Sequence, residues 1–441
     1  MFPLINSGLE SAIQQRLADR GPIQVAILGA GAAAAMIIRH LLQAAPWIHL
    51  GVIANRDLNR AASAVAKITG NRPPEVNTID ELSAQAQKLE TAITRDADLL
   101  LDSPSVNVVI EATGTIEFAA RNVLRALARG KHVVLVNAEL DSTLGPILKA
   151  RADAHGVVLT HTDGEEPGVA MTLLRYLQGL GLKTVAAGNL KGMIDNYRTP
   201  ESQRDFAARF GINARKAASF ADGTKLAMET CVLANATGFQ VGRRGMYGPK
   251  CAHVREMANL LPADQMLNGG LVDYALGAEP HSGAFVIVHE DHPLKQSDLA
   301  YFKMGEGPFY AFHTPFHLPH IQIVSSIARA VLLGEATVNA RGAQACEVIT
   351  VAKRDLRTGE CLDGVGGFAA YGVLENARVS TSENLLPMGV SEGCRLIRDV
   401  TKDQPLSYDD IELPHNRLCD QLRAEQASIC GVLETSAQPP Q

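Results

Sequence analysis

A run of small residues, Gly29 to Ala34, sets the tightest limit on the fold of this chain. It matches the pattern G-x-G-x-x-A, follows a predicted buried strand at 23–28 and opens a predicted helix. The first glycine permits a tight turn, the second lets the backbone approach a pyrophosphate, and the free N–H groups of the helix start face the phosphates. We therefore predict a dinucleotide site at Gly29, Ala30, Gly31 and Ala32. A loop selected only for helix–sheet packing is the alternative.

Strand and helix patterns alternate through the first third of the chain. Apolar strands are predicted at 50–54, 106–110, 132–136 and 156–159, with helices at 58–68 and 118–129 between them. Such alternation requires crossover connections and so predicts a parallel, doubly wound sheet. We expect an α/β protein whose residues 1–160 form a Rossmann dinucleotide-binding domain.

Beyond residue 160 the pattern changes twice. Residues 161–340 predict a second α/β domain with long Gly-rich loops, in which a helix over 321–336 could pack back on the Rossmann domain. From about residue 347 helical patterns disappear, and short strands alternate with turn clusters. Residues 341–441 are therefore expected to be all-β.

Composition narrows the class of partner. The 441 residues carry 41 basic and 47 acidic side chains, a net charge of −6, without the basic segment of a nucleic-acid or membrane-surface binder. The longest apolar stretch, 25–38, is too short to span a bilayer and is interrupted by glycine. The seven cysteines form no C-x-x-C pair, which predicts a reducing compartment, the cytoplasm. We expect a small-molecule enzyme without nucleic-acid or membrane partners.

The residues about twenty positions after the glycine motif bear on cofactor choice. An NAD site usually places an acidic residue there, whereas this chain reads Asn55-Arg56-Asp57. Arg56 can receive a 2′-phosphate and Asn55 does not repel it, so NADPH is favoured; Asp57 facing the ribose would invert the preference. Further contacts with the nicotinamide end are expected at two strand ends, from Ala112, Thr113, Gly114 and Asn137.

Two stretches, 108–114 and 130–137, resemble the nucleotide domain of homoserine dehydrogenases, although Ala138 replaces the lysine that usually follows their asparagine. The whole chain resembles homoserine dehydrogenase-like proteins that add a C-terminal SAF (β-clip) domain. That group is similar to 1-deoxy-D-xylulose 5-phosphate reductoisomerase-like enzymes. The stretches that carry this wider resemblance are 219–229, 303–310, 386–389 and 398–400.

The loop after the last predicted Rossmann strand holds three carboxylates in four positions, Asp163, Glu165 and Glu166. Like charges this close need a cation, a proton or solvent. Asp163-Gly164-Glu165 is similar to the Asp-Ser-Glu motif with which reductoisomerases hold a divalent metal, so the resemblance implies Mg²⁺ or Mn²⁺ at Asp163 and Glu165, with Glu229 as third ligand. Capping of the following helix is the alternative.

Basic residues are candidates for substrate chemistry. Lys225 stands four residues before Glu229 on a predicted helix, and the resemblance implies a substrate contact there rather than a plain surface ion pair. Lys191 follows a strand and could donate to a developing alkoxide. Arg243, Arg244 and Lys303 lie in Gly-rich loops suited to an anionic substrate, although each alone is commonly a solvated charge. His313 and His317 have zinc-ligand spacing, but Pro315 between them argues against a helix.

The resemblance implies an NADPH- and metal-dependent reductoisomerase that converts 1-deoxy-D-xylulose 5-phosphate to 2-C-methyl-D-erythritol 4-phosphate, working as a homo-oligomer, in the simplest case a dimer. A homoserine dehydrogenase-like reduction without rearrangement is the first alternative. A non-catalytic dinucleotide or sugar sensor is the second, because fold alone does not decide function.

Overall fold

The structure is a computed structural model that describes residues 8–432. The chain divides into two compact units. Unit one consists of the residues up to Leu140, Leu148–Glu165 and Leu318–Asn339. Unit two consists of Asp141–Ile147, Glu166–His317 and the residues from Ala340 onward. Within the described residues, no helix is long and apolar enough to cross a membrane.

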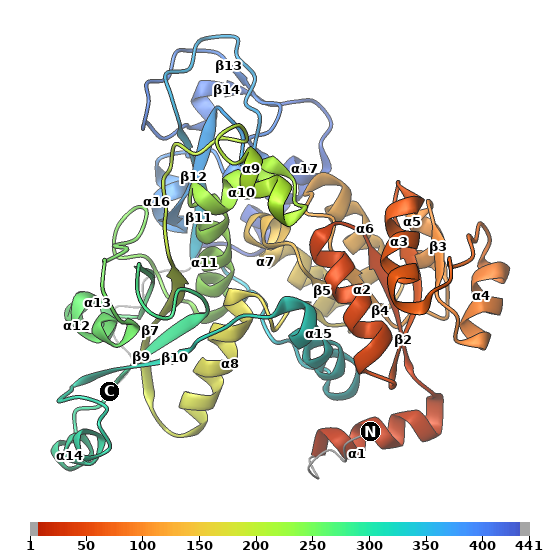
Figure 1. Ribbon diagram of the computed structural model, residues 1–441. Coiled ribbons are helices and arrows are strands. Elements are labelled where there is room, and N and C mark those ends of the chain that lie inside the picture. The colour runs from red at the N-terminus through yellow and green to blue at the C-terminus, as the bar shows by residue number, and fades with distance from the viewer. Residues whose placement is uncertain (1–7, 433–441) are drawn as a thin grey trace. The chain divides into compact units, whose positions relative to one another are not determined.

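Unit one contains a six-stranded parallel sheet in the order β3-β2-β1-β4-β5-β6, which confirms the predicted doubly wound Rossmann sheet (Figure 1). The strands are mostly buried and largely apolar, as expected for a sheet covered on both faces. They are β1 (Ile23–Leu28), β2 (Ile48–Ala54), β3 (Ala92–Thr94), β4 (Val108–Glu111), β5 (His132–Leu135) and β6 (Leu159–His161).

Helices of unit one pack on this sheet through apolar faces. One core joins β1 and β2 to buried side chains of the second, third and fifteenth helices, among them Ala34, Ile38, Val65 and Ile327. The helices are α1 (Gly8–Arg20), α2 (Ala32–Ala44), α3 (Leu58–Thr69), α4 (Ile79–Lys88), α5 (Ala97–Asp102), α6 (Glu117–Ala128), α7 (Ala138–Ala154, whose middle belongs to unit two) and α15 (Pro319–Ala328), which continues as the π-helix η2 (Arg329–Leu333).

Unit two contains a four-stranded mixed sheet in the order β10-β9-β7-β8. Only the β7–β8 pair is parallel. The strands are β7 (Lys183–Lys191), β8 (Leu271–Leu276), β9 (Ala284–His289) and β10 (Phe309–Thr314). The helices of this part are α8 (Glu166–Gly179), α9 (Arg204–Phe210), α10 (Ala214–Ala221), α11 (Thr224–Thr237), α12 (Met257–Leu260), α13 (Ala263–Leu267) and α14 (Pro293–Tyr301), with the 3-10 turn η1 (Val254–Glu256).

The C-terminal hundred residues are mainly short strands and turns, as predicted, and they belong to unit two. They form two small antiparallel sheets, β11 (Cys346–Ala352) with β12 (Ala370–Asn376) and β13 (Arg395–Leu396) with β14 (Ile411–Glu412), plus the turns η3 (Met388–Val390) and η4 (Tyr408–Asp410). The expectation that helices disappear here is wrong: α16 (Ala377–Ser382) and α17 (Leu418–Ile429) are helical. Cys419, Leu422 and Gln426 provide the buried stripe of α17 at helical spacing.

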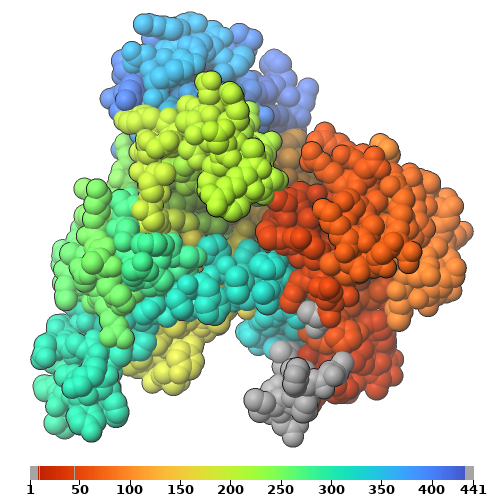
Figure 2. Space-filling view, in the orientation of Figure 1, coloured from red at the N-terminus to blue at the C-terminus, as the bar shows by residue number. Residues whose placement is uncertain are grey.

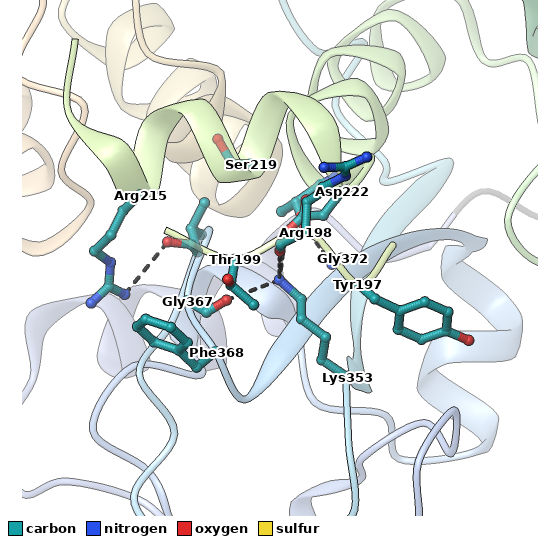
Figure 3. A network of polar contacts seen from close by, with 12 residues as sticks. Tyr197, Arg198, Thr199, Arg215, Ser219, Asp222, Lys353, Gly367, Phe368 and Gly372 are labelled. Carbon is teal, nitrogen blue, oxygen red and sulfur yellow. Dashed lines mark hydrogen bonds and ion pairs between the residues drawn. The ribbon is translucent and has the colours of Figure 1, made fainter. Parts of the chain in front are cut away.

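A buried lysine ties these strands to the preceding helices. The ammonium of Lys353 donates to the carbonyl of Arg198 at 2.7 Å, the carbonyl of Gly367 at 2.9 Å and a carboxylate oxygen of Asp222 at 2.9 Å (Figure 3). Figure 2 shows the yellow-green α9–α10 segment lying against the blue C-terminal part, where the carbonyl of Val365 accepts a hydrogen bond from Arg215. The strands of the C-terminal part are therefore joined to α11 and its neighbours in one unit.

Candidate functional site

The glycine motif forms the turn that the sequence predicted. Gly29 has a φ of +102°, and a side chain there would place Cβ 2.9 Å from the carbonyl oxygen of Ala112, so only glycine fits. Gly31 is the N-cap of α2, and nothing lies within 4 Å of where its Cβ would be. Open space therefore adjoins the free N–H groups of a helix start, the arrangement that binds a pyrophosphate. Gly29, Ala30, Gly31 and Ala32 fit a dinucleotide.

Asn137 and Glu111 form a buried polar corner at the carboxyl ends of β4 and β5. The Asn137 amide donates to Glu111 Oε2 at 2.6 Å and to the carbonyl of Thr115 at 2.7 Å, and its oxygen caps α7 at the Leu140 N–H. Thr113 donates from its hydroxyl to the other Glu111 oxygen. Burial raises the pKa of Glu111, and the Thr113 and Asn137 hydrogen bonds partly offset that rise. The corner fixes the strand ends beside the Gly29 turn.

The loop after β2 bears on the choice between NAD and NADP. The Asp57 carboxylate caps α3 at the Asn59 N–H and lies 3.4 Å from Arg60. Arg56 is exposed, and its carbonyl accepts a hydrogen bond from the guanidinium of Arg95 at 3.2 Å. The acidic side chain is thus engaged by its own helix, while Arg56, two residues after the end of β2, is exposed.

Asp163 and Glu165 are buried in unit one, with 6% and 8% of their surface exposed. The carboxylate of Glu165 bonds to Nε2 of His161, and the Asp163 N–H donates to the Ser326 hydroxyl at 2.7 Å. A Cβ at Gly164 would lie 2.4 Å from Cα of Pro319. This close approach leaves no room for a side chain at position 164.

Four charged side chains meet in unit two, where β7 ends and where α8 and α11 begin. The ammonium of Lys191 lies 2.7 Å from Glu166 Oε1 and 3.8 Å from Glu229 Oε2, and the ammonium of Lys225 lies 3.6 Å from Glu229 Oε1. Glu166, Lys225 and Glu229 are 2%, 7% and 7% exposed. We call these four residues the Glu–Lys cluster.

Two further groups adjoin the Glu–Lys cluster. Nδ1 of His317 lies 3.9 Å from Glu166 Oε1 and 3.0 Å from the hydroxyl of Ser282. The site thus combines two predicted substrate residues, Lys191 and Lys225, with Glu166 and His317, for which the sequence predicted no role in proton transfer. The available sequence signal for Glu166 was its place in the first turn of a largely apolar helix.

Burial sets the protonation of the Glu–Lys cluster. Burial raises the pKa of Glu166 to about 8. The nearby charge of Lys191 lowers this pKa, and the nearby charge of Glu229 raises it. Desolvation by itself would lower the pKa of Lys191, but Glu166 and Glu229 outweigh it and the net shift is upward. Near neutral pH the cluster therefore holds protons on Lys191 and on Glu166, both available for proton transfer.

The predicted metal ligands do not assemble in either unit. Asp163 and Glu165 belong to unit one and Glu229 to unit two. Among the described residues, no group of three or more His, Cys, Asp or Glu side chains could hold a metal ion. Glu166 Oε2 is buried without a hydrogen-bond partner in the described structure, yet Lys191 already contacts Glu166 and Lys225 already contacts Glu229. These residues by themselves do not fit a divalent ion.

The predicted anion-binding residues have different surroundings. Arg243 donates to the carbonyls of Met246 and Tyr247, at 2.9 and 3.2 Å, and Lys303 is exposed after α14. Arg244 pairs with Glu375 and Glu383, each at 2.6 Å. Another cation, Lys250, lines a cavity of about 480 Å³ that also includes Gly192, the residue after Lys191.

His313 and His317, the two histidines with zinc-ligand spacing, and the nearby His320 have different partners. His313, on β10, packs its ring edge-on against His253, with ring centres 5.8 Å apart. His320, on α15, packs against His40 with ring centres 6.5 Å apart, and His317 adjoins Glu166.

Two family models match the chain. Residues 29–161 match "Homoserine dehydrogenase, NAD binding domain", and residues 164–323 match "Oxidoreductase DRL, catalytic domain". The first match coincides with the Rossmann sheet and the glycine turn, and the second contains all four residues of the Glu–Lys cluster. The two matches together indicate an NAD(P)-dependent oxidoreductase, with a dinucleotide-binding domain similar to that of homoserine dehydrogenases and a second region similar to the DRL catalytic domain.

A curated relative, the homoserine dehydrogenase of Synechocystis, is 25% identical over 233 residues, which are 47% of this chain and 52% of the relative. The chain thus spans about half the length of this relative. A solved homoserine dehydrogenase from Thiobacillus denitrificans is 15% identical, with 87% of this chain and 97% of that one covered and a TM-score of 0.40. The 1-deoxy-D-xylulose 5-phosphate reductoisomerase of Zymomonas mobilis, solved with NADPH, is 16% identical, with 47% and 56% covered and a TM-score of 0.32. Structural likeness at this level carries no information about activity.

Proposed function

We propose that this chain is an NADPH-dependent reductoisomerase that converts 1-deoxy-D-xylulose 5-phosphate to 2-C-methyl-D-erythritol 4-phosphate. The observation that carries the proposal is the Glu–Lys cluster, a buried group of proton-holding side chains within the region similar to the DRL catalytic domain. A simple binding protein has no need of such a costly arrangement of buried charges.

The reaction requires hydride and proton transfer in balance. One C–C bond of the substrate breaks and another forms, which gives an aldehyde. The hydride of NADPH then adds to the aldehyde carbon, and one proton goes to its oxygen. The side chain of Lys191 is 22% exposed and its ammonium can donate that proton, and Glu166, 2.7 Å away, can return one to Lys191. The sum consumes one NADPH and one proton.

The substrate phosphate needs a cation to bind it, and Lys250 is the best-placed candidate. It is exposed, lines the 480 Å³ cavity beside Gly192 and forms no ion pair with a described carboxylate. Arg244, by contrast, is already paired with two glutamates. We therefore assign the phosphate to Lys250 ahead of Arg243, Arg244 and Lys303.

Arg56 supports the preference for NADPH, because its guanidinium can pair with a 2′-phosphate while Asp57 is engaged by α3. A divalent ion, implied by the resemblance of Asp163-Gly164-Glu165, would polarise adjacent substrate oxygens when bound. The residues of the Glu–Lys cluster do not fit such an ion by themselves.

A homoserine dehydrogenase-like reduction without rearrangement is the second candidate, favoured by the match of residues 29–161. Its weakness is Ala138, which stands where those enzymes usually carry lysine. In the third candidate, a sensor, NADPH binds but no substrate is turned over.

The test compares NADPH oxidation with 1-deoxy-D-xylulose 5-phosphate against aspartate semialdehyde, each with Mg²⁺, Mn²⁺ or a chelator, and identifies the product by mass. We expect turnover of the sugar phosphate. Turnover of the semialdehyde alone would establish the second candidate, and NADPH binding without any turnover the third. Loss of turnover in chelator would support the metal prediction.

A further inference from the structure

A cavity of about 700 Å³ lies in unit one, away from the glycine turn. Its lining includes Asn107 and His132, which stand at the starts of β4 and β5, together with residues of α1 and of η2. The dinucleotide motif and Asn137 lie at the opposite, carboxyl ends of the parallel strands. The cavity is therefore separate from the dinucleotide site, and its size is within the range of small-molecule pockets.

The lining of this cavity is strongly basic. Arg16 and Arg20 come from α1, and Arg129 and Lys131 precede β5; Asp19 is the one acidic side chain among the lining residues. Arg129 is paired with Asp102, at 2.9 Å. Within residues 8–432, no ion pair joins Arg16, Arg20 or Lys131 to a carboxylate. Three cations thus adjoin the cavity without an ion pair to a carboxylate among the described residues.

Lys131 is the most unusual of these cations, because its side chain is buried and only 4% exposed. Its ammonium donates to the carbonyls of Ser103 and Val106, at 2.6 and 3.1 Å. Two neutral acceptors do not repay the desolvation of a charge, and burial accordingly lowers the pKa of Lys131 to about 8. A nearby anion would compensate that cost.

The guanidinium of Arg16 also lacks a partner for one of its nitrogens. Its Nη2 donates to the side-chain oxygen of Asn107 at 3.3 Å, whereas its Nη1 is buried and has no hydrogen-bond partner among the described residues. A buried guanidinium nitrogen without an acceptor is costly, and the fork of Arg matches the oxygens of a phosphate group.

We propose that this cavity is a second ligand site, which binds a phosphate-bearing small molecule between Arg16, Arg20 and Lys131. The ligand supplies the acceptor that Arg16 Nη1 lacks and a negative charge close to the ammonium of Lys131. Val331 and Leu332 of η2 provide an apolar wall for the rest of the ligand. The site does not depend on the reaction proposed above.

The test measures binding of inorganic pyrophosphate to the full chain by calorimetry, with NADP⁺ present at saturation so that the dinucleotide site is filled. We expect one pyrophosphate per chain. Because a hydrogen bond to a charged group contributes about 1.5–3 kcal/mol, Arg16→Gln should weaken binding by about tenfold or more. Arg60→Gln is the matched control, since Arg60 is an exposed arginine on α3.

A second variant, Arg20→Gln, keeps the test decisive if Arg16→Gln does not fold, because Arg20 is exposed in the last turn of α1. Binding of pyrophosphate to Arg20→Gln should also weaken by several fold. Absence of saturable binding to the NADP⁺-loaded protein would overturn the proposal. So would equal affinities of wild type, Arg16→Gln and Arg20→Gln, or an equal loss in Arg60→Gln, which would reveal a nonspecific charge effect.

Discussion

Replacing Lys353 by methionine should destabilise unit two severely. The ammonium of Lys353 makes three hydrogen bonds, at 2.7, 2.9 and 2.9 Å, and one of them neutralises the carboxylate of Asp222. Asp222 is 0% exposed, so its charge would be left unpaired in the interior. Loss of one partner of a buried ion pair costs about 3–5 kcal/mol. We expect the free energy of unfolding to fall by that amount in urea titrations near neutral pH.

The pH dependence of the loss identifies Asp222 as its cause. Burial already raises the pKa of Asp222 while Lys353 lowers it, so removing Lys353 raises the pKa further. A carboxyl whose pKa is higher in the folded state is stabilising below its unfolded pKa, and this contribution is lost as pH rises through the folded pKa. Lys353→Met should therefore approach wild-type stability at about pH 4 and deviate most at about pH 8.

Two controls accompany this measurement. The double variant Asp222→Asn with Lys353→Met removes both charges and should recover much of the loss. Lys295→Met, at a lysine 63% exposed and 3.1 Å from Glu290, should cost less than about 1 kcal/mol. A loss below about 1 kcal/mol in Lys353→Met, or a double variant no more stable than the single one, would refute the explanation.

Three further variants test the cofactor and proton sites. Gly29→Ala places Cβ 2.9 Å from a carbonyl oxygen at a φ of +102°, so NADPH affinity measured by fluorescence should fall by about tenfold or more; wild-type affinity would contradict the assigned turn. Arg56→Gln should weaken NADPH binding about tenfold and leave NADH binding unchanged. The control variant Arg60→Gln should change the binding of neither cofactor. Equal effects of Arg56→Gln on both cofactors would exclude a 2′-phosphate contact. Glu166→Gln should lower kcat by about a hundredfold and abolish the decline of rate above about pH 8, where Glu166 loses its proton. The control variant Glu290→Gln should keep the wild-type pH–rate profile. An unchanged pH–rate profile in Glu166→Gln would show that Glu166 takes no part in proton transfer.

Local periodicity was enough to predict the Rossmann sheet. The strands at 23–28 and 132–135 and the helix at 58–69 lie within a residue or so of their predicted bounds. Each has a regular apolar pattern flanked by a turn, and the glycine turn is specified by residues that are adjacent in sequence. The C-terminal helices were missed because Gly-rich turns dominate that region and because α16 is only six residues long.

The candidate site depends on contacts that local sequence does not encode. Glu166, Lys191 and Glu229 are 25 and 38 residues apart in sequence order, and only the packing of β7 against α8 and α11 brings them together. Lys250 likewise reaches the cavity beside Gly192 through the pairing of its loop with β8. The carboxylate motif was visible in the sequence. That the pKa of the neighbouring Glu166 is strongly raised follows from its burial, which only the structure shows.

Isotope transfer from the cofactor tests the central claim most directly. The protein is incubated with 1-deoxy-D-xylulose 5-phosphate and NADPH deuterated at the transferring position, and the product is analysed by mass spectrometry and NMR. We expect 2-C-methyl-D-erythritol 4-phosphate that carries one deuterium, bound to the carbon of the newly formed primary alcohol. An unlabelled product, or deuterium in an alcohol that keeps the original carbon skeleton, would contradict reduction after rearrangement.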